Sequence, residues 1–403
     1  MFRQVRAEKT IYGKGENLLI RGSVMRMPEE MQALYGTAQC VYADPPFMTG
    51  EKFMRRRPYG EKGWKTGSPA PRYPAYTDQY ADEKQYLRLL RRIVTEAKAL
   101  LSETGVFYLH LDWRMAAAAR QMCDREFGKG RFLNEIIWTY ESGGRAKRYF
   151  PRKHDVILLY AKTKDYRFDI TRVGAPRGEK RRNHMARGRD EQGRMFSRIT
   201  SNGKEYRYYD DEPVYPGDVW TDIGWLQQRD PERTGYATQK PLRLLERLLL
   251  PVTNPGDLVV DTCCGSGTAA AAAQRLDCRF AAMDRNPEAV AVTLSRLAPG
   301  NLTVICPGGG KAELLAENEA ESGRFTMEGL RTEHPAFPAG GTPMDNLEAW
   351  ETGTIEDGVF RAEQSFRRSY RYPELQRTLK TERPVKAVMT TDAAGIRRAF
   401  AER

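Results

Sequence analysis

The sequence predicts an α/β fold of the Rossmann-like, doubly wound kind, with a mostly parallel sheet, an inserted basic region and a C-terminal extension. Two observations predict it. Apolar runs of strand length alternate with amphipathic helical segments along most of the chain, and this alternation is typical of a parallel sheet that helices cover on both faces. A strongly basic stretch between residues 142 and 215 interrupts the alternation, which then resumes. The 403 residues leave room for two or three units.

The first part of the chain supplies strands and helices in turn. Its expected strands are apolar runs at residues 17–20, 41–43, 106–111, 133–140 and 156–160, and its expected helices are periodic segments at 27–35, 86–101 and 114–127. Residues 48–80 are rich in Gly, Pro, Tyr and basic side chains. A connector of this length needs a role, so this segment is expected to be a mobile lid or disordered.

The second part of the chain repeats the alternation around a glycine turn. Pro241 begins an amphipathic helix, because proline is favourable at the first helical position. A strand at 258–260, the turn 261–268, a helix at 269–276 and a strand at 280–283 that ends at Asp284 follow in this order. Glycines at 308–310 predict a linker. The residues after this linker show weak periodicity, and no task is assigned to them.

The net charge of the chain is concentrated in one place. Residues 142–208 hold 19 Lys/Arg and 7 Asp/Glu, so that this segment carries the whole net charge of +12 and the remainder of the chain is neutral. A solvated surface spreads its charge, whereas a segment that binds a polyanion concentrates it. The basic region therefore predicts contact with nucleic acid.

Composition also restricts the class of protein. No apolar run reaches the length of a membrane span, and the N-terminus has no secretion signal. The six cysteines have no metal-ligand spacing and are expected to be reduced. The four histidines are likewise expected to have no metal-binding or catalytic role. A cytoplasmic protein without a metal site is the expectation.

One stretch at a strand end suits the binding of an aromatic amine. Asp44 is followed by Pro45 and Pro46, which cannot donate to a sheet ladder, so Asp44 is expected at the end of its strand. The Asp44 carboxylate and the Pro45 carbonyl can accept hydrogens of an exocyclic amine, and Phe47 can stack on the ring. These residues therefore predict a site for a planar ring that carries an amine.

The glycine turn predicts a second site. Its residues, 261–268, read Asp-Thr-Cys-Cys-Gly-Ser-Gly-Thr. Glycines let the backbone approach a ligand, and the helix that follows presents free amides. Asp284 is placed to bind ribose hydroxyls, so the turn predicts an adenosine-containing cofactor. On this stretch alone a nicotinamide dehydrogenase and a structural turn stay open, but the Asp-Pro-Pro-Phe stretch and the basic region have no place in hydride transfer to a small substrate.

With both sites in view, the chain resembles the beta group of DNA amino-methyltransferases, which use S-adenosylmethionine. Members of this group carry Asp-Pro-Pro-Phe/Tyr first, then a target-recognition segment, a Thr-Gln-Lys-Pro helix start and the glycine turn. The same order is found here at residues 44–47, 142–215, 238–241 and 261–268. The resemblance covers about residues 12–300 and is specific, because four motifs agree in order and spacing.

By position, the resemblance implies a role for each motif. Asp44, Pro45, Pro46 and Phe47 would bind a flipped-out target base. The residues implied to bind S-adenosylmethionine are Asp261, Cys263, Gly265, Ser266, Gly267, Thr268 and Asp284, with Gln239 and Lys240 near its carboxylate. Two departures weaken the implied cofactor contacts: Thr262-Cys263 replaces the usual Pro-Phe, and Ser23 stands where an aspartate is usual.

Double-stranded DNA is the partner that the resemblance implies. Side chains expected to contact DNA phosphates are Arg55, Arg56, Arg57, Arg145, Lys147, Arg148, Arg181 and Arg182. A homodimer and a cognate restriction enzyme are further partners implied by the family, and no membrane contact is expected.

The resulting prediction is a bacterial or phage enzyme that methylates the N6 amine of adenine at a defined DNA sequence. Asp44, in place of a serine, resembles the adenine-modifying members. Cytosine N4 methylation and a catalytically idle DNA-binding protein are the alternatives. The expected units are an acceptor half at 1–141, a target-recognition region at 142–215, a cofactor half at 216–305 and an extension of unassigned role at 306–403.

Overall fold

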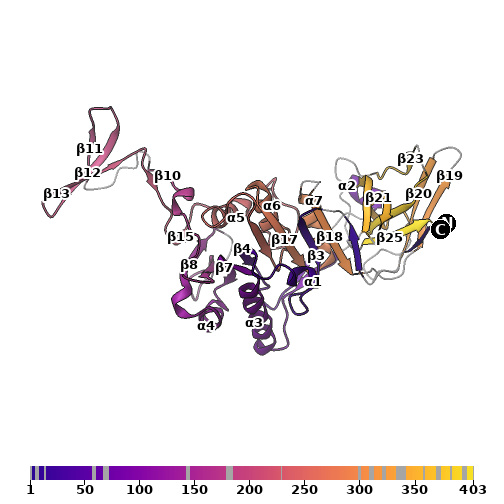
Figure 1. Cartoon of the computed structure of the whole chain (residues 1–403), viewed down its shortest axis with the longest axis horizontal. Coiled ribbons are helices and arrows are strands. Elements are labelled where there is room, and N and C mark those ends of the chain that lie inside the picture. Colours follow the sequence, from indigo (N-terminus) through magenta and orange to yellow (C-terminus); the bar gives the residue numbers. More distant parts are fainter. Residues whose placement is uncertain are drawn as a thin grey trace.

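The computed structural model describes most of the chain. Its described residues are 2–4, 9–12, 15–56, 60–66, 72–141, 146–177, 185–227, 229–297, 301–307, 313–319, 324–332, 342–356, 359–368, 374–381, 384–392 and 397–402. Three parts follow one another along the longest axis of the molecule: a protruding arm, an α/β body and a C-terminal β-unit (Figure 1).

The body is built on a mixed, mostly parallel sheet of nine strands in the order β18-β3-β17-β16-β4-β7-β9-β8-β15. Only β9 runs antiparallel to both of its neighbours within this order. The strands are β3 (Asn17–Arg21), β4 (Ala38–Ala43), β7 (Leu101–Asp112), β8 (Phe132–Thr139), β9 (His154–Ala161), β15 (Val219–Trp220), β16 (Leu258–Asp261), β17 (Arg279–Asp284) and β18 (Leu302–Pro307). The predicted α/β fold is confirmed.

Helices cover both faces of this sheet, as the doubly wound arrangement requires (Figure 1). The helices α1 (Glu29–Gln32), α3 (Glu83–Leu100) and α4 (Ala116–Phe127) pack on one face, and α5 (Leu242–Leu249), α6 (Thr268–Arg275) and α7 (Pro287–Arg296) pack on the other. Leu90 and Ile93 of α3 are buried against the face that carries Val41. Alanines along α6 let this helix lie close to the opposite face, which carries Tyr42.

The parallel strands bring several carboxylates to one edge of the sheet. β16 pairs in parallel with both β4 and β17, and β4 pairs in parallel with β7. Their carboxyl ends therefore lie at the same edge, and this edge carries Asp44, Asp112, Asp261 and Asp284. Because ligands of open α/β sheets bind beyond the carboxyl ends of the strands, the site is expected here.

The segment that follows Phe47, expected to be a lid or disordered, contains regular structure. Strands β5 (Lys52–Arg56) and β6 (Arg72–Thr77) form an antiparallel pair, and the short helix α2 (Gly60–Thr66) lies between them in the chain. Lys65 of this helix forms an ion pair with Glu374 of the C-terminal unit. We call β5, α2 and β6 the lid; through Lys65 it contacts the C-terminal unit.

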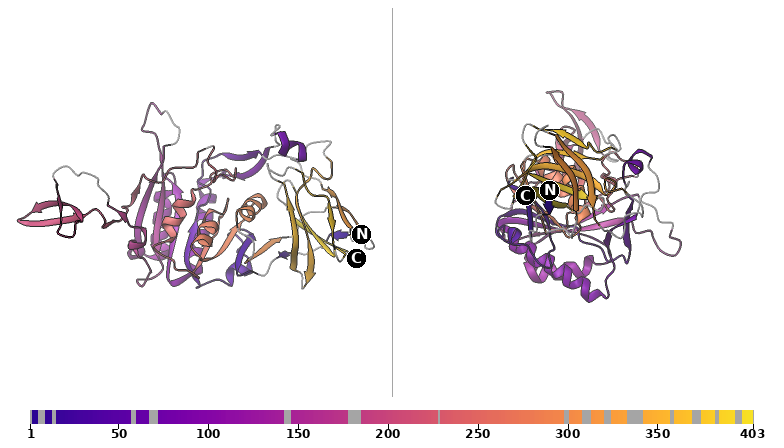
Figure 2. Two further views of the ribbon diagram at one scale, coloured as in Figure 1. Left: turned by 90° about the horizontal axis from the view of Figure 1, so that it is seen from above. Right: turned by 90° about the vertical axis from the view of Figure 1, so that its right-hand side faces the viewer.

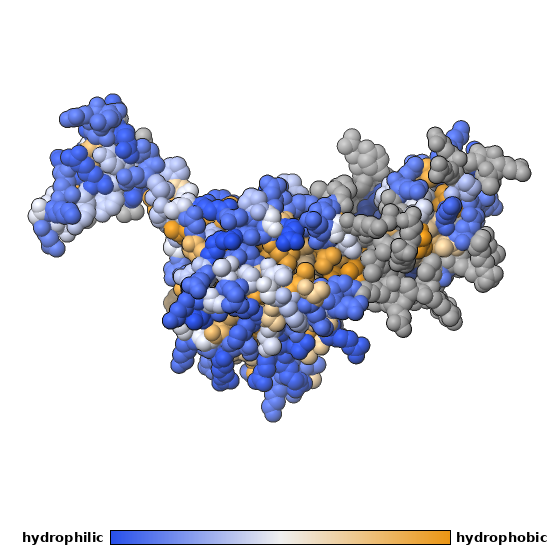
Figure 3. Space-filling model, in the orientation of Figure 1, coloured by the Kyte–Doolittle hydropathy of each residue, from blue (hydrophilic) through white to orange (hydrophobic). Residues whose placement is uncertain are grey.

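The arm carries most of the inserted region. It contains β11 (Ala186–Arg189), β12 (Met195–Ser201) and β13 (Lys204–Tyr209), joined to the body near β10 (Ala175–Pro176) and β14 (Pro213–Val214). Its visible face is mostly hydrophilic (Figure 3). Strand β9 falls within the predicted recognition region, yet it is an interior strand of the body.

The C-terminal extension is a β-unit with its own core around Trp350 and Phe400. Its strands are β19 (Glu313–Glu319), β20 (Arg324–Arg331), β21 (Leu347–Glu356), β22 (Val359–Arg367), β23 (Thr378–Lys380), β24 (Ala387–Asp392) and β25 (Arg397–Glu402). β1 (Phe2–Gln4) pairs with β25 and β2 (Lys9–Tyr12) with β22, so the two chain ends lie side by side (Figure 2). Across the described ranges, every helix is too short or too polar to cross a membrane.

Candidate active site

The loop after β4, residues 44–49, is held in place by the buried carboxylate of Asp78. This carboxylate accepts hydrogen bonds from the backbone amides of residues 47, 48 and 49, at 3.2, 2.7 and 2.8 Å. The Tyr86 hydroxyl donates to the Pro46 carbonyl at 2.7 Å. Within the described part of the chain no donor meets the Pro45 carbonyl. The loop is thus fixed from behind, and the Pro45 carbonyl stays available to a ligand.

Asp44 lies in the cavity with a lysine beside it. The Lys240 ammonium is 2.9 Å from one carboxylate oxygen of Asp44 and 3.1 Å from the other. The same ammonium lies 4.7 Å from the centre of the Phe47 ring. Asp44 and Lys240 come from distant parts of the chain, and their ion pair joins the loop after β4 to the start of α5.

The glycine turn forms the opposite wall of the cavity. Gly265 and Gly267 have φ angles of +50° and +74°, a region that favours glycine. The Gly265 amide donates to Asp284 at 3.0 Å, and the Thr293 hydroxyl donates to the Gly265 carbonyl at 3.2 Å. A Cβ atom on Gly267 would lie 2.5 Å from a methyl carbon of Thr293. The turn therefore requires glycine and is fixed by contacts to β17 and α7.

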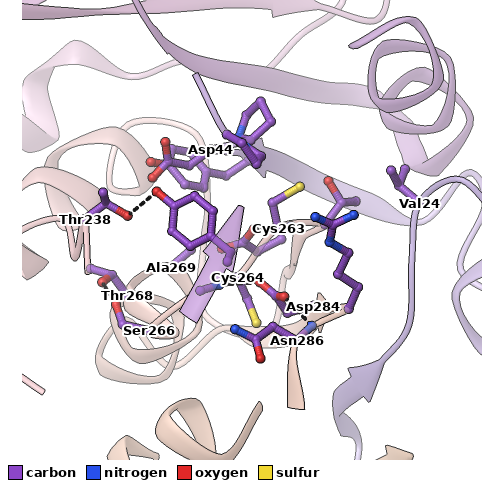
Figure 4. A pocket seen from close by; sticks show the side chains of 18 of the residues that line it. Val24, Asp44, Thr238, Cys263, Cys264, Ser266, Thr268, Ala269, Asp284 and Asn286 are labelled. Atoms are coloured by element: carbon purple, nitrogen blue, oxygen red, sulfur yellow. Dashed lines mark hydrogen bonds between the residues drawn. The ribbon is translucent and has the colours of Figure 1, made fainter. Parts of the chain in front are cut away.

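Three carboxyl groups line this cavity: those of Asp44 and Asp284 (Figure 4) and that of the buried Asp261. Burial raises the pKa of Asp261 well above its ordinary value, and the charges of Asp44 and Asp284 raise it further. Burial also raises the pKa of Asp284, although the amides of Asn286 and Gly265 oppose the shift. A cation in the cavity would relieve the repulsion among these carboxylates. The site is therefore suited to a positively charged ligand.

Aromatic side chains complete the wall. Tyr76 of the lid stacks on Phe53 with 4.6 Å between ring centres and lies 6.5 Å from the Tyr236 ring. The Tyr76 hydroxyl is 3.2 Å from that of Thr238. Thr238 has a φ angle of +60°, which is strained for a β-branched residue. The lid is thus tied to the strained turn that precedes Lys240.

The structure brings most of the predicted site residues together. The cavity is lined by Asp44, Pro45, Pro46, Phe47, Lys240, Asp261, Cys263, Gly265, Ser266, Thr268 and Asp284. Gln239 and Gly267 are absent from this lining. The Gln239 amide donates to the Glu232 carbonyl at 2.8 Å and accepts from the Thr234 amide at 2.8 Å. The Lys240 ammonium, expected near a cofactor carboxylate, instead pairs with Asp44.

The structure describes only some of the residues predicted to contact DNA. Arg57, Arg145, Arg181 and Arg182 lie outside the described residues, and for Arg55 and Arg56 the structure describes only the backbone, in β5. Lys147 and Arg148 are exposed in the loop between β8 and β9. In the arm, Arg187 and Arg194 form ion pairs with Asp210 and Asp211. Lys147 and Arg148 thus follow the carboxyl end of β8, whereas these two arm arginines are each paired with an aspartate.

A ridge of cations and aromatic rings stands at this edge of the sheet; of its residues, sequence reasoning named Lys147 and Arg148 but missed the aromatic side chains and Arg152. We define the ridge as Trp113, Arg114 and residues 146–153. The Arg152 guanidinium lies 3.8 Å from the Trp113 ring centre and 4.7 Å from that of Tyr149. Phe150 is 94% exposed. Exposed rings among cations are typical of surfaces that bind nucleic acid.

Other contributors were missed because they carry no local motif. Asp78 and Tyr236 belong to no recognisable pattern, and each acts through a partner distant in sequence. Within the described ranges, no group of three or more His, Cys, Asp or Glu side chains is placed to hold a metal ion.

Comparison with known proteins identifies relatives of this chain. The family model of N6/N4 methyltransferases, described as DNA methylase, matches residues 38–295. The DNA adenine methyltransferase YhdJ of Escherichia coli is 26% identical over 294 residues, which cover 72% of this chain and 85% of YhdJ. The type II methyltransferase M.EcaI of Enterobacter cloacae is 26% identical over 318 residues, which cover 65% of each protein.

Solved structures of DNA methyltransferases also align with this chain, at lower identity. The cytosine-N4-specific PvuII DNA methyltransferase is 14% identical, with a TM-score of 0.44 over 72% of this chain and 91% of that one. The M1.HpyAVI complex with S-adenosylmethionine is 15% identical, with a TM-score of 0.41 over 70% of this chain and 100% of that one.

Proposed function

The chain belongs to the N6/N4 DNA methylase family, and from this premise we propose that it transfers a methyl group from S-adenosylmethionine to the N6 amine of adenine in a flipped-out base. The observation that carries the proposal is the position of Asp44. Its carboxylate lies in the cavity next to the Pro45 carbonyl and across from the glycine turn. The adenine activity named for YhdJ supports the same choice of base.

The cavity fits the methyl donor of this family, S-adenosylmethionine. The fit rests on the glycine turn, whose left-handed backbone brings its amides to the cavity, and on the carboxyl groups of Asp261 and Asp284 that line it. Asp284 would take the ribose hydroxyls, and the turn at 263–268 would hold the methionine portion. When bound, the donor supplies an electrophilic methyl group on a cationic sulfur.

The chain's own residues would then orient the amine. Asp44 and the Pro45 carbonyl would accept hydrogen bonds from its two N–H groups. These hydrogen bonds would withdraw the nitrogen lone pair from the ring and direct it at the methyl group of S-adenosylmethionine. Phe47 would stack on the base. Asp44 would accept the proton that the nitrogen loses and release it to water. The rate would come from positioning and from a fixed negative charge beside a nitrogen that becomes positive.

The amine of a paired base is out of reach, so the base must leave the duplex. We place the DNA along the ridge, because its rings and cations lie at the same sheet edge as Asp44. Phe150 would stack on the bases exposed by flipping, and Lys147 and Arg148 would neutralise phosphates. In this arrangement residues 142–215 read the sequence, and residues 1–141 and 216–305 carry out the transfer.

The test is to incubate the protein with DNA and tritiated S-adenosylmethionine, digest the DNA, and separate the nucleosides. Label in N6-methyladenine is the expected result, and label in N4-methylcytosine would assign the other base. DNA retention without label would contradict methyl transfer. Sequencing for modified adenine in host DNA, with the gene present or absent, would identify the recognised site.

A further inference from the structure

A chain of buried polar groups crosses the sheet behind the acceptor site. The Tyr42 hydroxyl is 2.8 Å from Nδ1 of His110, and Nε2 of His110 is 3.1 Å from Asp155. The Tyr140 hydroxyl donates to the other oxygen of Asp155 at 2.9 Å. Strands β4, β7, β9 and the end of β8, which supply these residues, are neighbours in the sheet. The chain is therefore fixed by strand register.

The hydrogen-bond directions make Asp155 a carboxylate. Burial raises the pKa of the Tyr42 phenol well above its ordinary value, so this hydroxyl keeps its proton and donates to Nδ1 of His110. Nε2–H of His110 is then left to donate to Asp155. Burial alone would raise the pKa of Asp155, but the His110 hydrogen bond and the Lys240 charge outweigh it and the pKa lies below its ordinary value.

Asp155 also faces the lysine that pairs with Asp44. The Lys240 ammonium is 2.9 Å from Asp44 and 3.9 Å from Asp155, and Lys240 is only 7% exposed. One ammonium is thus shared by two carboxylates, and the three groups together carry one negative charge. Without Asp155, the pair of Lys240 and Asp44 would be neutral. A neutral pair would give little stabilisation to a nitrogen that becomes positive during methyl transfer.

We propose that Asp155 is a positioning residue for methyl transfer. Its carboxylate draws Lys240 away from Asp44 when the target amine docks. This role rests on the proposed function. Tyr140 and His110 fix the Asp155 carboxylate, and the ammonium moves from the nearer carboxylate toward the farther one. Asp44 then keeps its negative charge for the amine, while the buried ammonium keeps a partner throughout.

The test compares Asp155→Asn, Lys240→Met and the double variant with the wild type. Asparagine keeps the shape of Asp155, but its single oxygen can accept from only one of Tyr140 and His110, and its neutral amide leaves Lys240 on Asp44. We expect kcat of Asp155→Asn to fall about 10- to 100-fold, with the KM for DNA and the affinity for S-adenosylmethionine unchanged. In the double variant no ammonium holds Asp44, so kcat should recover above that of Asp155→Asn alone.

A structural role for Asp155 predicts the opposite order, because a second core substitution would then add to the damage. A double variant as impaired as Asp155→Asn, or more so, would therefore overturn the role. Asp124→Asn is the matched control: Asp124 accepts from Tyr160 at 2.6 Å and pairs with Arg120 far from the cavity, and its kcat should stay at the wild-type value.

Two further outcomes are decisive. If Asp155→Asn does not fold, Tyr140→Phe replaces it, because this variant keeps both charges and removes one hydrogen bond; its kcat should fall about threefold, and an unchanged kcat would overturn the role. A wild type that transfers no methyl group to any DNA amine would overturn the proposed function itself. An active wild type with a fully active Asp155→Asn variant would overturn only the role of Asp155.

Discussion

Tyr42 of β4 and Asp261 of β16 are paired in neighbouring parallel strands, although most of the chain separates them. This pairing places Asp44, two residues beyond Tyr42, beside the turn that follows Asp261. The acceptor motif and the glycine turn therefore share one cavity (Figure 4). The proposed chemistry depends on this neighbourhood.

Replacing Asp44 should separate catalysis from cofactor binding. Asp44→Ala removes the carboxylate that would bind the amine, so we expect methyl transfer to fall by about 100- to 1000-fold. Affinity for S-adenosylmethionine, measured by calorimetry, should change little, because the turn at 263–268 stays intact. Asp165→Ala, at an exposed position in the loop after β9, is the control. Retained transfer in Asp44→Ala would show that the acceptor site lies elsewhere.

Gly267→Ala should damage the glycine turn through a steric clash. The new Cβ would lie 2.5 Å from a Thr293 methyl carbon, and Thr293 fixes the turn through the Gly265 carbonyl. Gly36→Ala is the matched control, because Gly36 has a φ of +77°, against +74° at Gly267, and open space around it. Both variants should lose about 1–2 kcal/mol of unfolding free energy to the left-handed backbone. Only Gly267→Ala should lose more than this and bind S-adenosylmethionine at least about tenfold more weakly; equal losses would contradict the clash.

The body of this fold could be predicted because its strands and helices have local patterns. Val41 and Val260 lie in short apolar runs, and Asp44, Asp261 and Asp284 follow directly after such runs. Parallel pairing then brings strand ends to one edge without any further information. Asp155 could not be found in this way, because its meaning comes from Lys240 and His110, which are distant in sequence.

The C-terminal unit was not predicted as a fold for a similar reason. Its core combines Phe325, Trp350, Val388 and Phe400 from four strands, of which β21 pairs with β24 although β22 and β23 lie between them in the chain. The sequence of this unit shows weak periodicity, and β1 and β2 join it from the other end of the chain. The ion pair between Lys65 of the lid and Glu374 of this unit depends on this pairing between the two ends of the chain.

Two cations of the ridge, Lys147 and Arg148, should contribute to DNA binding by neutralising phosphates. If Lys147 and Arg148 each neutralise one phosphate, the variant Lys147→Gln/Arg148→Gln should reduce the slope of log K against log salt by about 1.8. Lys129→Gln is the control, because Lys129 is exposed ahead of β8, at the opposite sheet edge. Fluorescence anisotropy with a labelled duplex at several salt concentrations measures both. A slope unchanged by the double variant would remove these side chains from the DNA surface.

Phe150 should act on DNA differently from these cations. Its ring is 94% exposed, and stacking of a ring on a base contributes about 1–3 kcal/mol. Phe150→Ala should weaken DNA binding by this amount and leave the salt slope unchanged. A 2-aminopurine base at the target position should also fluoresce less in the complex, because flipping is less favourable. Phe168→Ala, away from the ridge and 37% exposed, should change neither quantity; equal effects of the two variants would contradict the stacking role.

The raised carboxyl pKa values predict how cofactor binding depends on pH. Burial and mutual repulsion raise the pKa of Asp261 well above 3.8, and burial raises that of Asp284. For the free protein, stability should therefore fall as pH rises from the ordinary carboxyl pKa through the raised values, because the buried groups become charged. A cation in the cavity favours the ionised carboxylates and lowers these pKa values. S-Adenosylmethionine should consequently bind with release of protons, and its affinity should increase with pH.

The demethylated product, S-adenosylhomocysteine, provides the control for this prediction, because it has the same adenosine and amino acid parts but no charge on sulfur. Its affinity should depend less on pH, and its binding should release fewer protons. Calorimetry between about pH 5 and pH 8, in buffers with different protonation enthalpies, measures the released protons directly. Asp284→Asn should reduce the proton release for S-adenosylmethionine, because one of the titrating carboxylates is gone. Identical proton release for the two ligands would show that the sulfonium charge does not face Asp261 and Asp284. The part of the cavity that accepts the sulfonium would then have to be sought elsewhere.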